Sequence, residues 1–189
     1  MPDYSIVSSE NLIGLVWFAA PSMSGVDDLE AVFDQVARSC SRRIGFATRL
    51  TRETVSRGAN PEVRKGLSTV LRRFGPRIGA TVVIYEEIGM KAAFVRTVIS
   101  TINLLSRAQF PTEVHANVLQ GCMWMMDALG PDAPVDGEKR LLRMLPGVPA
   151  QPVTQPTPVW ASGAAPRPAP NPPGIGSDTA STQSPRKST

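Results

Sequence analysis

The side chains of this chain that could do chemistry are few and scattered. Glu86 and Glu87 follow an apolar run that ends at Tyr85, and a pair of carboxylates at a strand end can serve as general acid and base. Adjacent residues of an extended chain point to opposite sides, however, so the two carboxylates are not expected to face one substrate. A solvated loop is the favoured interpretation of Glu86 and Glu87.

The remaining reactive side chains give no catalytic or metal-binding pattern. The single histidine, His115, has no nucleophile or acidic residue at a spacing typical of a catalytic triad. Two isolated cysteines, Cys40 and Cys122, fall on the apolar faces of predicted helices, which favours buried packing groups over a redox pair or a metal site. We therefore expect no enzymatic activity, no cofactor and no bound metal.

Positive charge is concentrated between Arg38 and Arg77, where eleven basic residues stand against two glutamates. A basic solvated surface is the favoured interpretation, but guanidinium groups also suit bidentate contacts with carboxylates or phosphates. Arg49, Arg52 and Arg57 are the most interesting of these residues, since we expect them on an exposed loop at the carboxyl end of a strand. We predict them to contact a partner. Nucleic-acid binding is not expected, because aromatic residues do not interleave with these charges.

The order of apolar runs and helix-period stretches predicts an α/β fold. Expected strands are Tyr4–Ser8, Leu12–Phe18, Ile44–Leu50, Ile78–Tyr85 and Glu113–Ala116. Expected helices run from about Ser24 to Cys40, from a cap at Asn60 to Phe74, from Gly89 to Leu105 and from Val118 to Leu129, whereas Thr51–Ala59 is expected to be a loop. Strands separated by helices imply a small sheet of four or five mostly parallel strands, covered by about four helices.

Composition divides the chain into three segments. Residues 1–130 form the predicted domain, and 131–146 form a weakly specified helical extension over Glu138–Leu145. Residues 147–189 are rich in Pro, Ala and Ser, and we expect them to be disordered because they cannot bury enough apolar surface. The N-terminus does not resemble a signal peptide, and no run approaches the roughly 20 apolar residues of a membrane span. A cytoplasmic protein is therefore expected.

The layout from Tyr4 to Leu129 resembles the STAS fold, which comprises sulfate-transporter and anti-sigma-factor-antagonist domains. The resemblance depends on the strand TVVIYE, the short strand PTEVHA and the closing helix GCMWMMDAL, and it is greatest to divergent single-domain relatives. It implies a non-enzymatic switch or binding module. Regulated STAS members carry a phosphorylated serine in a characteristic turn, but the corresponding stretch, residues 49–58, offers Thr51, Thr54 and Ser56 without that motif. No phosphorylation site is carried over.

The predicted helix from Gly89 to Leu105 has a wider apolar stripe than one buried face requires. Met90 and Phe94 lie at its margin, so we predict them to be exposed partner contacts, although packing on the sheet is the simpler alternative. The sequence thus favours a protein-interaction or signalling-regulation module that binds another protein or a second copy of itself. The alternative is a binder of a small apolar or acidic ligand between the sheet and a helix.

Overall fold

The computed structural model describes residues 2–57, 60–87 and 89–146 of the chain. The segment 147–189, expected to be disordered, lies outside the described residues. Five strands and six α-helices occur among the described residues: β1 (Tyr4–Ser9), β2 (Leu12–Trp17), α1 (Met23–Ser39), β3 (Ile44–Leu50), α2 (Arg52–Arg57), α3 (Pro61–Phe74), β4 (Ile78–Ile84), α4 (Met90–Ser106), β5 (Thr112–His115), α5 (Val118–Leu129) and α6 (Gly137–Met144).

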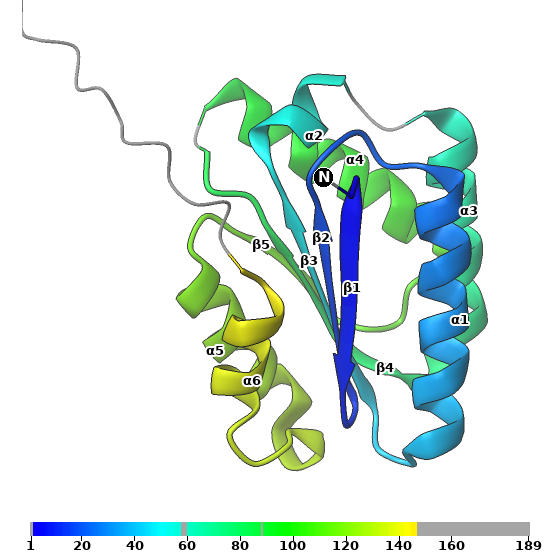
Figure 1. The fold of residues 1–189 in the computed structure, drawn as a ribbon, viewed down its shortest axis with the longest axis vertical. Helices are drawn as coiled ribbons and strands as arrows, with labels where there is room; N and C mark the ends of the chain where they lie inside the picture. The colour runs from blue at the N-terminus through cyan, green and yellow to red at the C-terminus, as the bar shows by residue number, and fades with distance from the viewer. Residues whose placement is uncertain (1, 58–59, 88, 147–189) are drawn as a thin grey trace, which may run out of the picture. The chain divides into compact units, whose positions relative to one another are not determined.

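The five strands form one sheet in the order in which they occur along the chain. β1 pairs with β2 antiparallel, and all other neighbouring strands are parallel, which confirms the predicted α/β class. Because each parallel strand is added on the same side of the last, right-handed crossovers put their helices on one face. α1, α3 and α4 therefore cover one side, the three-helix face, while α5 and α6 cover the other, the two-helix face (Figure 1).

On the three-helix face, the core near α1 and α3 is built from aromatic rings. Phe33 of α1 stacks on Phe74 of α3, with ring centroids 5.1 Å apart, and meets the edge of Phe46 of β3 at 5.3 Å. Trp17 of β2 is buried beside Tyr4 of β1. Strand alternation explains this arrangement, because residues two apart on each strand share one face.

The two-helix face is packed by aliphatic side chains and methionines. Gly121 allows α5 to approach β4 closely, since a Cβ atom there would lie 3.2 Å from Val82 and Ile84. Leu141 and Met144 of α6 are buried against the same core. The sequence specifies α6 only weakly, yet the structure makes this helix part of the fold.

Local capping accounts for the places where prediction and structure agree and differ. Asn60 caps α3 as predicted, and its side chain accepts a hydrogen bond from the Glu62 amide. α1 begins at Met23 rather than Ser24, because Ser22 supplies the cap. The predicted loop Thr51–Ala59 was wrong over Arg52–Arg57, which forms α2 and raises the number of α-helices above the four expected.

Candidate functional site

The three arginines predicted to contact a partner do not form one exposed group. Arg49 lies within β3 and points to the two-helix face, where its side chain is only 11% exposed. One of its nitrogens donates to the Leu145 carbonyl at 3.0 Å, and another pairs with Glu86. Arg52 is exposed at the start of α2, and Arg57 is the last residue of that helix. The expectation of a shared exposed loop was wrong for Arg49, because strand alternation places it beneath the end of α6.

The two glutamates after β4 are engaged by neighbouring side chains. Glu86 pairs with Arg49, whereas Glu87 pairs with Arg52 and accepts a hydrogen bond from the Tyr85 hydroxyl at 2.8 Å. Hydrogen bonds from Tyr85 and Arg52 lower the pKa of Glu87, and burial raises the pKa of Tyr85 to about 12. The interpretation as a merely solvated loop was incomplete. This cluster joins α2 to the end of β4, and its carboxylates already serve as ion-pair acceptors.

Much of the positive charge between Arg38 and Arg77 is compensated within the fold. Four of these arginines pair with carboxylates elsewhere in the chain: Arg42 with Glu10, Arg49 with Glu86, Arg52 with Glu87, and Arg73 with Glu30 and Asp34. Arg77 donates to the Cys40 carbonyl. These pairs support the interpretation of the segment as a structural and solvated surface.

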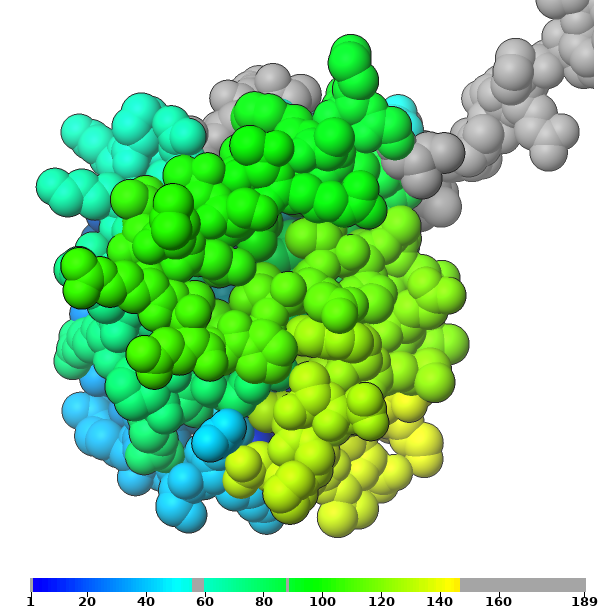
Figure 2. Space-filling view, turned by 180° about the vertical axis from the view of Figure 1, so that it is seen from behind, coloured from blue at the N-terminus to red at the C-terminus, as the bar shows by residue number. Residues whose placement is uncertain are grey.

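The outer face of α4 carries exposed apolar side chains near both of its ends, with the exposed Thr97 and Thr101 between them. Met90 is 90% exposed, Phe94 51% and Leu104 79%, while Val95 and Ile102 turn inward. The predicted exposure of Met90 and Phe94 is thus confirmed. α4 lies across the surface on the side opposite the view of Figure 1 (Figure 2). Its charged residues, together with the residue that ends it, are Lys91, Arg96 and Arg107, all basic.

The surroundings of His115 and the two cysteines limit the reactivity of their side chains. His115 packs near Trp124 of α5, with ring centroids 5.9 Å apart, and its Nε2 lies 3.0 Å from the Glu113 carboxylate without the geometry of a hydrogen bond. Cys122 is fully buried on the two-helix face, and burial raises the pKa of its thiol to about 12. Cys40, at the end of α1, is half-buried.

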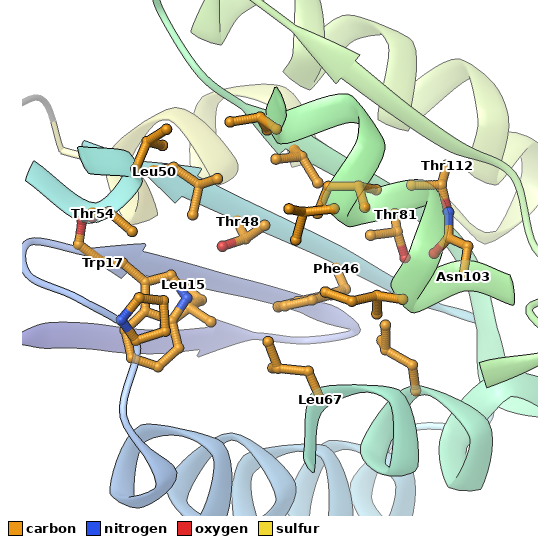
Figure 3. A pocket seen from close by; sticks show the side chains of 18 of the residues that line it. Leu15, Trp17, Phe46, Thr48, Leu50, Thr54, Leu67, Thr81, Asn103 and Thr112 are labelled. Carbon is orange, nitrogen blue, oxygen red and sulfur yellow. Dashed lines mark hydrogen bonds between the residues drawn. The ribbon is translucent and has the colours of Figure 1, made fainter. Parts of the chain in front are cut away.

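A cavity of about 100 Å³ lies between the sheet and helices α2, α3 and α4. Its walls are mainly aliphatic and aromatic, and the lining side chains come from strands β2, β3, β4 and β5 and from helices α2, α3 and α4 (Figure 3). Leu15, Trp17 and Phe46 line it from the sheet, and Val98 and Ile102 line it from α4. Its lining residues include no charged side chain. Pockets of this type, apolar with a few polar groups, are the usual form of small-molecule sites.

Three threonine side chains face this cavity from three neighbouring strands. Thr48 of β3, Thr81 of β4 and Thr112 of β5 all line it, and Thr81 stands directly beside Thr112 in the strand register. The Oγ1 atom of each is buried and has no hydrogen-bond partner within the described part of the chain. Buried hydroxyls normally have a partner, so three orphans around one cavity mark it as the chemically unusual part of the fold.

Sequence reasoning missed this site. Thr48 lies in IGFATRL and Thr81 in IGATVVIY, two runs that simply predict buried strands, and threonine is a good strand former. The available signal was a polar residue on the same face of consecutive strands. That signal depends on strand order and register, which the residues of one strand do not specify.

The described residues contain no cluster of three or more His, Cys, Asp or Glu side chains suited to a metal ion. Among the described helices, none combines the length and the apolar character needed to cross a membrane. Comparisons with protein-family models, curated proteins and solved structures gave no match. The STAS resemblance therefore stays a prediction.

Proposed function

We propose that this chain is a non-enzymatic regulatory module, similar to STAS domains, that binds another protein through the outer face of α4. The supporting observation is the row of exposed apolar side chains on that helix: Met90, Phe94, Leu104 and Leu105. Apolar side chains gathered on one exposed helix face are typical of interaction surfaces. A cytoplasmic location belongs to the proposal and rests on the sequence alone.

Charge on α4 indicates the chemistry of the partner. Arg96 and Arg107 border the apolar row and belong to none of the ion pairs found among the described residues. Because α4 contains no acidic residue, two copies of this face would bring like charges together. The favoured occupant is thus a different protein whose apolar surface has an acidic rim. Arg52 lies near the start of α4 through its pair with Glu87, which also contacts Lys91.

The test is capture of a partner by the full chain from its native cells, followed by measurement of binding with the purified partner. The Met90→Ser/Leu104→Ser double variant removes two exposed apolar side chains without touching the core. Leu119→Ser/Met123→Ser is the matched control on α5, where the side chains are 46% and 54% exposed. We expect the α4 variant to lose at least about tenfold in affinity, equivalent to about 1.4 kcal/mol, and the α5 control to bind normally.

Two results would refute this proposal. One is the absence of any specific partner, and the other is equal binding by wild type and the α4 variant. Light scattering of the purified chain should give a monomer. A dimer that the α4 substitutions dissociate would show that a second copy, rather than a different protein, occupies this face.

A further inference from the structure

The cavity under α4 is unusual because its unpaired hydroxyls are so well buried. Thr48 is 8% exposed and Thr81 3% exposed, and both Oγ1 atoms lack a partner. A buried hydroxyl without a hydrogen bond costs roughly 1–3 kcal/mol relative to one that is paired. Valine has nearly the same shape as threonine and would remove that cost at both positions. The sequence therefore places hydroxyl groups in an apolar cavity where they form no hydrogen bond with the described residues.

Nearby threonines show that hydroxyls in this region are not generally left unpaired. Thr54 also lines the cavity, but its hydroxyl donates to the Trp17 carbonyl at 2.9 Å. Thr51, just outside the cavity, exchanges a hydrogen bond with Thr54 at 3.0 Å. Among the threonines that line the cavity, the unpaired hydroxyls are those of Thr48, Thr81 and Thr112, which point into it from strands β3, β4 and β5.

We propose that the cavity binds a small, neutral, apolar molecule that carries a hydroxyl or carbonyl group. The observation is the set of three orphan threonine hydroxyls in an uncharged, apolar enclosure. A threonine hydroxyl can donate or accept, so either kind of oxygen satisfies it. This inference is independent of the protein-binding role of α4. The sequence left open a small ligand that is either apolar or acidic, and the inference retains only the apolar kind.

The distribution of lining residues gives the ligand an orientation. Thr81, Thr112 and Asn103 gather at one end of the cavity, whereas Trp17 and Leu50 lie toward the other (Figure 3). The oxygen of the ligand is expected at the threonine end and its hydrocarbon part toward the rings. The exposed Phe94 also lines the cavity, which places one wall at the protein surface.

Size and charge limit the class of ligand further. An apolar protein cavity of about 150 Å³ accommodates benzene, so the smaller volume of about 100 Å³ here limits a ligand to at most a single ring or a short branched chain. A carboxylate would be buried without a cationic partner from the described residues, since none of the lysines and arginines among them lines the cavity. Anionic ligands are therefore disfavoured.

Benzene, phenol and benzoate form a matched series of probes for this proposal. They share one ring and differ by no polar group, a hydroxyl and a carboxylate. Binding to the full chain is measured by titration with observation of the methyl NMR signals of Val83, Val95 and Ile102, which line the cavity. We expect phenol to bind at least about fivefold more tightly than benzene, because one net hydrogen bond contributes about 1 kcal/mol. Benzoate is expected not to bind.

Isosteric variants then identify the groups that recognise the oxygen. Thr81→Val and Thr48→Val should fold and gain stability, since each loses an unpaired hydroxyl, and Thr81→Val should bind phenol and benzene equally. Thr54→Val is the matched control, because its hydroxyl is already paired and the preference for phenol should persist. Val98→Phe, which fills the cavity from α4, should abolish binding of all probes.

Several outcomes would overturn the inference. If no probe shifts the cavity methyl signals, the hydroxyls bind water only. If phenol and benzene bind equally to wild type, or if Thr81→Val keeps the preference, the threonines do not recognise the ligand. Binding of benzoate comparable to that of phenol would refute the requirement for a neutral molecule.

Discussion

On the two-helix face a glycine brings α5 directly onto β4, whereas on the three-helix face α4 stands over a cavity. Strand β4 contributes side chains to both the packed core under α5 and the cavity under α4. Ala80, Val82 and Ile84 of β4 are buried in the aliphatic core under α5, while Thr81 and Val83 face the cavity. On the two-helix face the side chains fill the space between helix and sheet, whereas the three-helix face keeps empty space together with three unpaired threonine hydroxyls.

This difference indicates that the cavity is not a sign of general loose packing. Protein interiors are normally filled to the density of organic crystals. On the two-helix face, α5 and α6 bury their apolar side chains directly against the sheet. Empty volume and orphan hydroxyls occur together beside α4, the helix that also presents the exposed apolar row. A ligand in the cavity and a partner on α4 would therefore contact the same helix, and Phe94 belongs to both sites.

Truncation of a large side chain should affect the two faces unequally. Leu141→Ala removes a fully buried side chain from the two-helix face and should lower the free energy of unfolding by about 3 kcal/mol. Ile102→Ala on α4 should cost less, about 1–2 kcal/mol, because Ile102 borders the cavity and already lacks packing partners on that side. Urea unfolding measures both values. Equal losses would show that the faces are packed alike.

The pH dependence of stability should report the hydrogen-bonded hydroxyl of Tyr85, which lies on the three-helix face. Burial raises the pKa of Tyr85 from 10.0 to about 12, so the folded protein keeps this proton where the unfolded chain has lost it. The stabilisation is complete below pH 10 and disappears as pH rises toward 12. Its upper limit is about 2.7 kcal/mol for two pKa units.

Denaturation of wild type and Tyr85→Phe across this pH range tests the assignment. Tyr85→Phe should show a flatter decline above pH 10, because it has no phenol to titrate at that position. Tyr4→Phe is the comparison: the pKa of the partly exposed Tyr4 is also raised, by its hydrogen bond to Asp28, and its removal should flatten the decline less than that of Tyr85. If Tyr85→Phe leaves the curve unchanged, Tyr85 is not held protonated by the fold.

The sequence was sufficient for the layers of this fold but not for the contents of its interior. Apolar runs and helix periods placed all five strands and most helices, because each signal is local. α2 was missed since Thr51 and Thr54 define it through contacts with Phe18 and Trp17, which are distant in sequence. The cavity depends on three strands in register and on the distance of α4 from the sheet, neither of which any single segment encodes.

The candidate site residues also show that the sequence predicts local properties but not contacts between distant segments. Met90 and Phe94 were predicted from the excess width of one helical stripe, a local property, and their exposure is confirmed. Arg49 was grouped with Arg52 by proximity in sequence, although alternation along β3 and the position of Leu145 bury it. Exposure of a strand residue depends on what covers its face, and here that is a helix about 90 residues further along the chain.

Arg49 and Arg52 offer a matched pair for testing how the two-helix face is closed. Arg49→Met leaves the Leu145 carbonyl without its donor and should cost about 1–2 kcal/mol, with faster hydrogen exchange in α6. Arg52→Met removes an exposed ion pair and should cost less than about 1 kcal/mol, without an effect on α6. Similar effects of both substitutions would mean that Arg49 does not hold α6 to the sheet.

Thiol labelling should disturb the protein least. It tests most directly whether the two-helix face stays closed in the native protein. Cys122 is fully buried and burial raises its pKa to about 12, whereas Cys40 is half-buried at the end of α1. In native protein at neutral pH, a thiol reagent should therefore label Cys40 readily. In the Cys40→Ser variant, Cys122 should react only as fast as the whole domain unfolds, because thiolate formation requires α5 to leave β4. Labelling of Cys122 much faster than global unfolding would show that α5 opens locally, and the contrast between a closed face and an open face would then fail.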